Sequence, residues 1–91
     1  MAKRLHVVIA GRVQGVGFRY ATHRQAAVLG LHGWVRNLSS GRVEAEFEGA
    51  ENSLEAMLDW CRRGPAFSEV THVEPTWEVG EPKYVTFRIV G

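Results

Sequence analysis

The nine residues GRVQGVGFR (11–19) separate the first apolar run of the chain from its first helical pattern. The preceding segment, RLHVVIAG (4–11), is rich in β-branched residues and alternates its apolar side chains, which is typical of a strand. The three glycines of the stretch disfavour regular structure. From Phe18 the apolar spacing turns helical, and Gly30 is a natural end for that helix. We therefore predict a loop that joins a strand to a helix.

The rest of the chain continues with short elements and no linker, repeat or low-complexity segment. The turn SSG (39–41) lies between two strand-like runs, which indicates a hairpin. The segment 51–64 is the clearest helix, because apolar residues recur there at i, i+3, i+4 and i+7. Asn52 is its predicted N-cap, with Glu55 as the capping-box partner. The predicted strands of this part are LHGWVRN (31–37), RVEAEFEG (42–49), EVTHVEPTWEV (69–79) and YVTFRIV (84–90).

This order, β-α-β-β-α-β with a short final strand, predicts the ferredoxin-like fold of the α+β class. Two helices would cover one face of a mostly antiparallel sheet. The strand 42–49 alternates apolar residues with Glu44, Glu46 and Glu48, so its other face is expected to be solvated. A chain of 91 residues is expected to form one domain, 1–91.

Composition excludes several classes of function. The formal net charge is +1, too close to neutral to favour nucleic acid or an anionic membrane as a partner. No segment reaches the length of a membrane span, and the N-terminal apolar run is too short for a signal peptide. Cys61 is the only cysteine, which excludes an internal disulfide and fits a reducing compartment. We expect a cytoplasmic protein.

The glycine loop has the parts of a phosphate cradle. Glycines let successive N–H groups point into one concavity, and the following helix N-terminus adds partial positive charge. Arg19, in the first helical turn, adds a planar guanidinium whose N–H donors can bind two phosphate oxygens at once. The alternative is a loop that only turns, as most glycine-rich loops do. Neither a Walker A motif nor a G-x-G-x-x-G fingerprint is present.

Asn37 ends a predicted strand beside the hairpin turn. Its amide can donate and accept hydrogen bonds, and so could hold a water molecule. The alternative is an asparagine that only satisfies backbone groups of the turn.

Both features belong to signatures of a known family, and over essentially its whole length the chain resembles acylphosphatases. The first signature reads Gly11-Arg12-Val13-Gln14-Gly15-Val16-Gly17-Phe18-Arg19, and the second reads Gly33-Trp34-Val35-Arg36-Asn37, then Gly41, Val43 and Gly49. Both are complete. The chain departs from the family at GPAFSEV (64–70) and at Leu38, where a hydroxyl residue is common.

The resemblance implies hydrolysis of an acyl phosphate to a carboxylate and inorganic phosphate, without a metal or organic cofactor. It implies that Arg19 binds phosphate and that Asn37 orients the attacking water. Inorganic phosphate or a similar anion would act as product or inhibitor, and nothing requires more than a monomer. The phosphate-binding backbone would comprise Gln14, Gly15, Val16, Gly17, Phe18 and Arg19. No metal-ligand spacing appears among the remaining histidines.

The signatures supply no general base. His23 follows Arg19 by four residues, but a lone helical histidine is usually structural or solvated. We expect the substrate's own phosphate to take the proton of the water. Three other functions remain as alternatives: an RNA-binding module, a carbamoyl-phosphate-handling domain like that at the start of hydrogenase-maturation proteins, and a module that only senses acyl phosphates.

Overall fold

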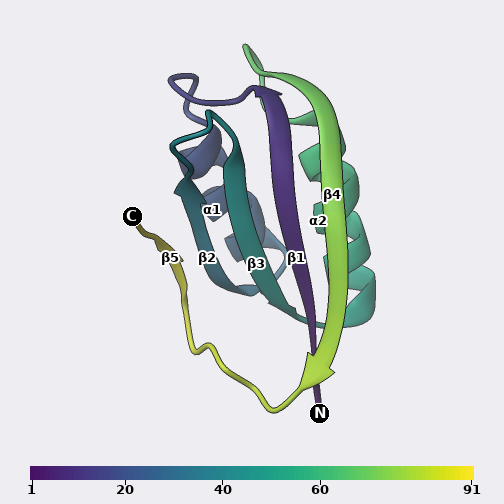
Figure 1. Ribbon diagram of the computed structural model, residues 1–91. Helices are drawn as coiled ribbons and strands as arrows, with labels where there is room; N and C mark the ends of the chain where they lie inside the picture. Colours follow the sequence, from purple (N-terminus) through teal and green to yellow (C-terminus); the bar gives the residue numbers. More distant parts are fainter.

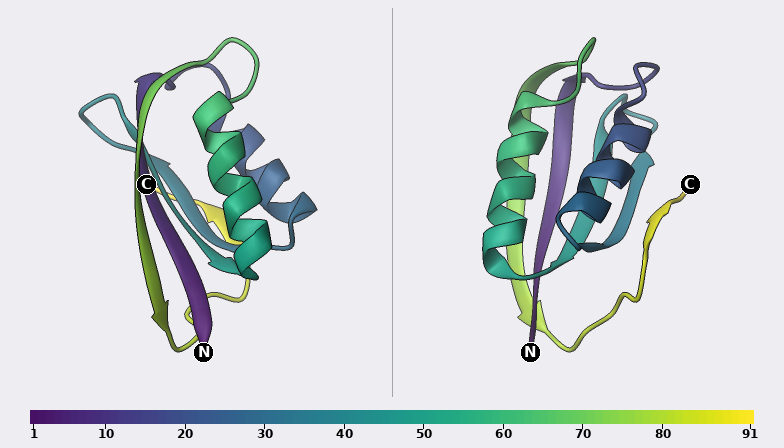
Figure 2. Two further views of the ribbon diagram at one scale, coloured as in Figure 1. Left: turned by 90° about the vertical axis from the view of Figure 1, so that its right-hand side faces the viewer. Right: turned by 180° about the vertical axis from the view of Figure 1, so that it is seen from behind.

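The computed structural model describes all residues, 1–91, and consists of a five-stranded sheet with two helices on one face (Figures 1 and 2). The strand order is β4-β1-β3-β2-β5, in which only the β2–β5 pair is parallel. This confirms the predicted ferredoxin-like α+β arrangement. The elements are β1 (Ala2–Arg12), α1 (Phe18–Val28), β2 (His32–Asn37), β3 (Val43–Gly49), α2 (Glu51–Arg63), β4 (Glu69–Gly80) and β5 (Phe87–Ile89).

The hydrophobic core lies between the sheet and the helices. Alternate residues of the central strands, Leu5, Val7 and Ile9 of β1 and Val43, Ala45 and Phe47 of β3, are fully buried there. From α2, Leu54, Met57 and Cys61 fill the same layer at the spacing predicted from the sequence. Helix α1 buries Phe18, Thr22 and Ala26. Neither helix combines the length and the apolar character that a membrane span requires.

Two local predictions were wrong. Helix α2 begins at Glu51, so Asn52 lies inside the helix and its side chain accepts only from the N–H of Ser53, at 3.0 Å. The chain passes from the end of β3 directly into the helix through Ala50, and the acidic Glu51 favours the first turn electrostatically. The last strand, expected over 84–90, is limited to Phe87–Ile89.

The helix-free face of β3 is not solvated, contrary to the prediction for Glu44, Glu46 and Glu48. Glu46 and Glu48 are buried and Glu44 is half-buried. The connection between β4 and β5, residues 81–86, runs around the end of the sheet (Figure 1), and Lys83 and Tyr84 contact Glu46 from this connection. Glu48 accepts hydrogen bonds from the backbone N–H groups of Lys83 and Tyr84. A carboxylate thus binds the backbone of Lys83 and Tyr84, and β5 pairs with β2 only from Phe87 to Ile89.

Candidate active site

The first glycine of the motif has a structural role. Gly11 has φ 127° and lies at an irregularity of the β1–β4 pairing. A Cβ atom at Gly11 would stand 2.0 Å from the carbonyl oxygen of Glu69. Only glycine therefore lets β4 approach β1 at this point.

The second and third glycines form the loop itself. Gly15 and Gly17 have φ 74° and 77°, and a Cβ at either position would point into open space. The apolar residues on either side of these two glycines anchor the loop in the core. Val13 and Phe18 are buried, and the Phe18 ring packs edge-on against Trp60 with a centroid distance of 5.6 Å. The loop is therefore anchored by its side chains while its backbone faces outward.

Six successive amides of this region, from residue 15 to residue 20, donate no hydrogen bond within the protein. The first helical bond runs from the N–H of Ala21 to the carbonyl of Gly17, at 3.0 Å. The first turn of α1 contains no acidic residue. Free N–H groups at a helix N-terminus, preceded by a left-handed glycine, form a concavity that suits an anion.

Arg19 adds a full positive charge to these partial charges. It is the second residue of α1, is half-buried, and forms no salt bridge with any carboxylate of the chain. Its guanidinium can therefore offer both donors of its fork to an anionic ligand.

Asn37 is the last residue of β2, paired with Val43 of β3. Its Oδ1 atom is buried and has no hydrogen-bond partner. Such an atom is rare in a folded protein, because desolvation of an unpaired acceptor costs free energy. This oxygen therefore accepts no hydrogen bond from the turn, as the alternative interpretation would require. The side chain presents a free acceptor at the end of β2.

Gln14 connects the two parts of the site. Its side-chain amide donates to the carbonyl oxygens of Leu38, at 2.7 Å, and Arg42, at 2.9 Å. Leu38 follows Asn37 directly, so the bond brings the glycine loop to the β2–β3 turn (Figure 1). The sequence pointed to the loop backbone at Gln14 but not to this use of its side chain. A polar residue among the apolar anchors of the loop was the available signal.

His23 and Cys61, two side chains that could carry chemistry, have other surroundings. His23 is exposed and packs edge-on against Phe87 of β5, with a centroid distance of 5.9 Å. Burial raises the pKa of the Cys61 thiol to about 12, which makes it unreactive at neutral pH. No three histidine, cysteine or acidic side chains gather as a metal site would require. The largest groove, of about 480 Å³, lies elsewhere, on the helix-free face.

The fold and this site define a small ferredoxin-like protein with an outward-facing glycine loop, a free arginine and an unpaired amide at one end of the sheet. Residues 5–89 match the acylphosphatase family model. An acylphosphatase of Thermococcus kodakarensis is 51% identical over 97% of this chain and 96% of its own length. An acylphosphatase of Syntrophus aciditrophicus is 46% identical over 99% and 94%. The chain belongs to the acylphosphatase family and is a hydrolase of acyl phosphates.

Solved structures agree with this assignment. The crystal structure of acylphosphatase from Bacillus subtilis superimposes with a TM-score of 0.94 at 38% identity, over 98% of this chain and 99% of that one. Full-length HypF matches with a TM-score of 0.89 at 34% identity, over all of this chain but 12% of its own. The fold therefore occurs both alone and as a small part of a larger protein.

Proposed function

We propose that the backbone of residues 14–19 binds the phosphate group of the acyl phosphate, and that Arg19 neutralises its charge. The free amides of residues 15 to 20 and the unpaired guanidinium support this role. Charge on the equatorial oxygens changes most in the transition state of phosphoryl transfer, so donors fixed around them accelerate the reaction. The loop already holds its donors in place, because Val13 and Phe18 anchor it in the core.

Asn37 would orient the attacking water. Its unpaired, buried Oδ1 is the single observation that carries this proposal, because it can accept a hydrogen bond from a water O–H. The water oxygen forms a bond to phosphorus as the bond from phosphorus to the acyl oxygen breaks. The carboxylate leaves with the electron pair, and a phosphate oxygen of the substrate takes the proton of the water. Asn37 then acts by position alone.

The test is the hydrolysis of benzoyl phosphate without added metal by the wild type and by Asn37→Ala. The reaction is monitored through the change in ultraviolet absorbance. We expect kcat to fall by roughly 100-fold or more, because positioning of the nucleophile is lost. Inorganic phosphate should still bind the variant. Asn52→Ala, an exposed change on α2, is the matched control. Full activity of Asn37→Ala would contradict the role of Asn37.

A pH–rate profile tests the source of the proton acceptor. Since His23 is exposed and packs against Phe87, we expect His23→Ala to keep the wild-type profile. A limb with a histidine pKa that disappears in His23→Ala would overturn substrate-assisted proton transfer.

We further propose that the domain 1–91 acts as a monomer in the cytoplasm. One hydrophobic core accounts for all buried apolar residues, and Cys61 is a free, buried thiol. Sedimentation of the active protein at its assay concentration tests the monomer, and a dimer of full activity would contradict it.

A further inference from the structure

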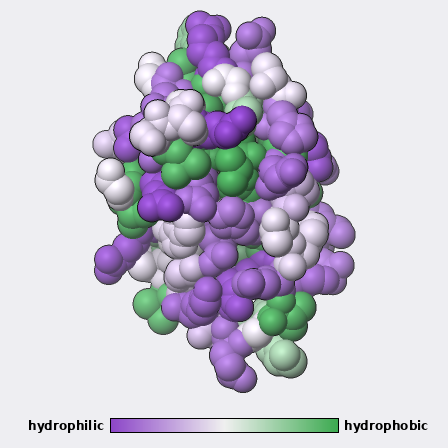
Figure 3. All heavy atoms as spheres, in the orientation of Figure 1, coloured by the Kyte–Doolittle hydropathy of each residue, from purple (hydrophilic) through white to green (hydrophobic).

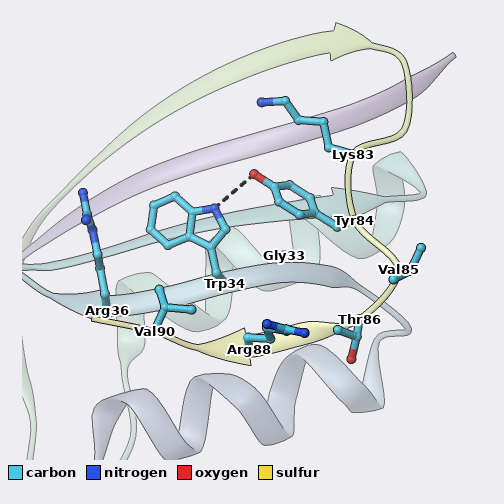
Figure 4. A pocket seen from close by; sticks show the side chains of 9 residues that line it. All are labelled: Gly33, Trp34, Arg36, Lys83, Tyr84, Val85, Thr86, Arg88 and Val90. Carbon is cyan, nitrogen blue, oxygen red and sulfur yellow. Dashed lines mark hydrogen bonds between the residues drawn. The ribbon is translucent and has the colours of Figure 1, made fainter.

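The largest groove lies on the opposite face of the sheet from the helices, along β2 and β5 (Figure 4). Trp34 forms its floor, and the row Thr86, Arg88 and Val90 lines one side. Val35 is buried in the core, so its neighbour Trp34 faces away from the helices. Asn37 shares the Val35 side of β2. The groove is therefore separate from the candidate active site, and its volume of about 480 Å³ suits a small organic ligand.

The charge of the groove favours an anion. Three cationic side chains, Arg36, Lys83 and Arg88, line it, and no carboxylate does. Arg36 is neutralised by Glu44 at 2.6 Å, and Lys83 lies 3.8 Å from Glu46. Arg88 is exposed and forms no salt bridge. Arg88, together with the loosely paired Lys83, can thus bind a negative group.

The floor of the groove favours a planar ring. The indole N–H of Trp34 donates to the Tyr84 hydroxyl at 3.0 Å, and the Arg36 guanidinium lies over one face of the ring, 5.4 Å from its centroid. Figure 4 shows the Trp34 ring held between these two side chains. A fixed aromatic side chain loses little entropy when a ring stacks on it.

The surroundings favour a ligand with one charged group over a long nucleic-acid strand. Beyond the groove, the same face carries Glu44 of β3 and Glu74 and Glu78 of β4. Glu44 pairs with Arg36, Glu78 with Arg4 and Glu74 with His72, so a strand that crossed the sheet would find few unpaired cations for its successive phosphates. Figure 3 shows this face as largely hydrophilic, with its apolar residues in separate clusters. A broad apolar protein interface does not fit such a surface.

We propose that this groove binds a nucleoside monophosphate. The base stacks on the face of Trp34 that Arg36 does not cover, and the phosphate pairs with Arg88 and Lys83. This site is additional to the hydrolysis of acyl phosphates and does not depend on the roles assigned to Arg19 and Asn37.

The test is a pair of NMR titrations of the ¹⁵N-labelled protein, one with adenosine 5′-monophosphate and one with inorganic phosphate alone. We expect saturable shifts of the Trp34 indole N–H and of the amides of residues 83–90. Arg88→Gln and Trp34→Leu should each weaken binding about tenfold, since a stacked base or a charged hydrogen bond contributes roughly 1–3 kcal/mol. Arg62→Gln, on the exposed side of α2, should change nothing.

Arg88 is exposed, so its variant keeps the fold even if Trp34→Leu is destabilised. Shifts confined to residues 14–19 and Asn37 would overturn the proposal, because the nucleotide would then use only the catalytic loop. Equal groove shifts with inorganic phosphate alone would overturn the role of the ring. A single-stranded oligoadenylate that binds the groove far more tightly than the monophosphate would replace the small ligand with a nucleic-acid strand.

Discussion

Arg19 can contribute to phosphate affinity through its positive charge and through the planar geometry of its guanidinium, and these two contributions can be separated. Arg19→Lys keeps the positive charge but loses the planar fork that matches two phosphate oxygens. One lost charge-assisted hydrogen bond is worth roughly 1.5–3 kcal/mol, so we expect the affinity for inorganic phosphate to fall by about 10- to 100-fold. Isothermal titration with phosphate measures this directly. Arg24→Lys, an exposed change on the same helix, should leave affinity unchanged, and wild-type affinity in Arg19→Lys would exclude a bidentate contact.

Two glycines of one motif should respond differently to the same substitution. Gly15→Ala puts a Cβ into open space at φ 74°, and the left-handed conformation costs roughly 1–2 kcal/mol of stability. Gly11→Ala puts it 2.0 Å from the carbonyl oxygen of Glu69, so β1 and β4 must separate. We expect a folded Gly15→Ala with weaker phosphate binding and a much larger loss of stability in Gly11→Ala. Urea unfolding compares them, and equal losses would contradict the separate roles.

Among the elements, the glycine loop and the β2–β3 hairpin form one unit through Gln14. Gln14→Leu removes both donors to the Leu38 and Arg42 carbonyls. The loop amides remain, so phosphate should still bind, but Asn37 would shift relative to the bound phosphate. We expect kcat to fall by up to about 100-fold with a much smaller change in phosphate affinity.

Steady-state kinetics and phosphate titration of Gln14→Leu separate these two effects. Gln25→Leu on α1 is the control, because its side chain forms no hydrogen bond to the hairpin. An equal loss of kcat and phosphate affinity would show that Gln14 only stabilises the loop.

Elements that are determined by a local sequence pattern could be predicted from the sequence. Features that depend on contacts with residues far away in the sequence could not. The loop between β1 and α1 follows from its own glycines, and α2 from its apolar spacing. The roles proposed for Arg19 and Asn37 rest on complete motifs, and the unpaired Oδ1 of Asn37 is consistent with the role proposed for Asn37. The burial of Glu46 and Glu48 depends on contacts with Lys83 and Tyr84, which lie 35 to 38 residues away along the chain. Strand alternation carries no information about such a contact.

At the scale of the whole molecule, Glu48 holds the connection 81–86 against the sheet through hydrogen bonds to its backbone. Burial alone would raise the pKa of this carboxyl, but hydrogen bonds from the Lys83 N–H, the Arg4 guanidinium and the Tyr84 N–H outweigh it and hold the pKa below its ordinary value of 4.5. A depressed pKa stabilises the folded state above the unfolded pKa, and this contribution is lost as the pH falls through the folded pKa.

Glu48→Gln should therefore destabilise the protein in a pH-dependent manner. The glutamine NH₂ would replace one carboxylate oxygen and face two of the three donors, and unpaired buried groups cost about 1–3 kcal/mol at pH 7. Below the folded pKa the wild-type carboxyl is itself protonated, so the difference between the two proteins should shrink. Urea unfolding at several pH values measures both free energies, and Glu55→Gln, exposed on α2, should show no such trend. A difference that stays constant into acid would mean that the charge of Glu48 does not hold the connection.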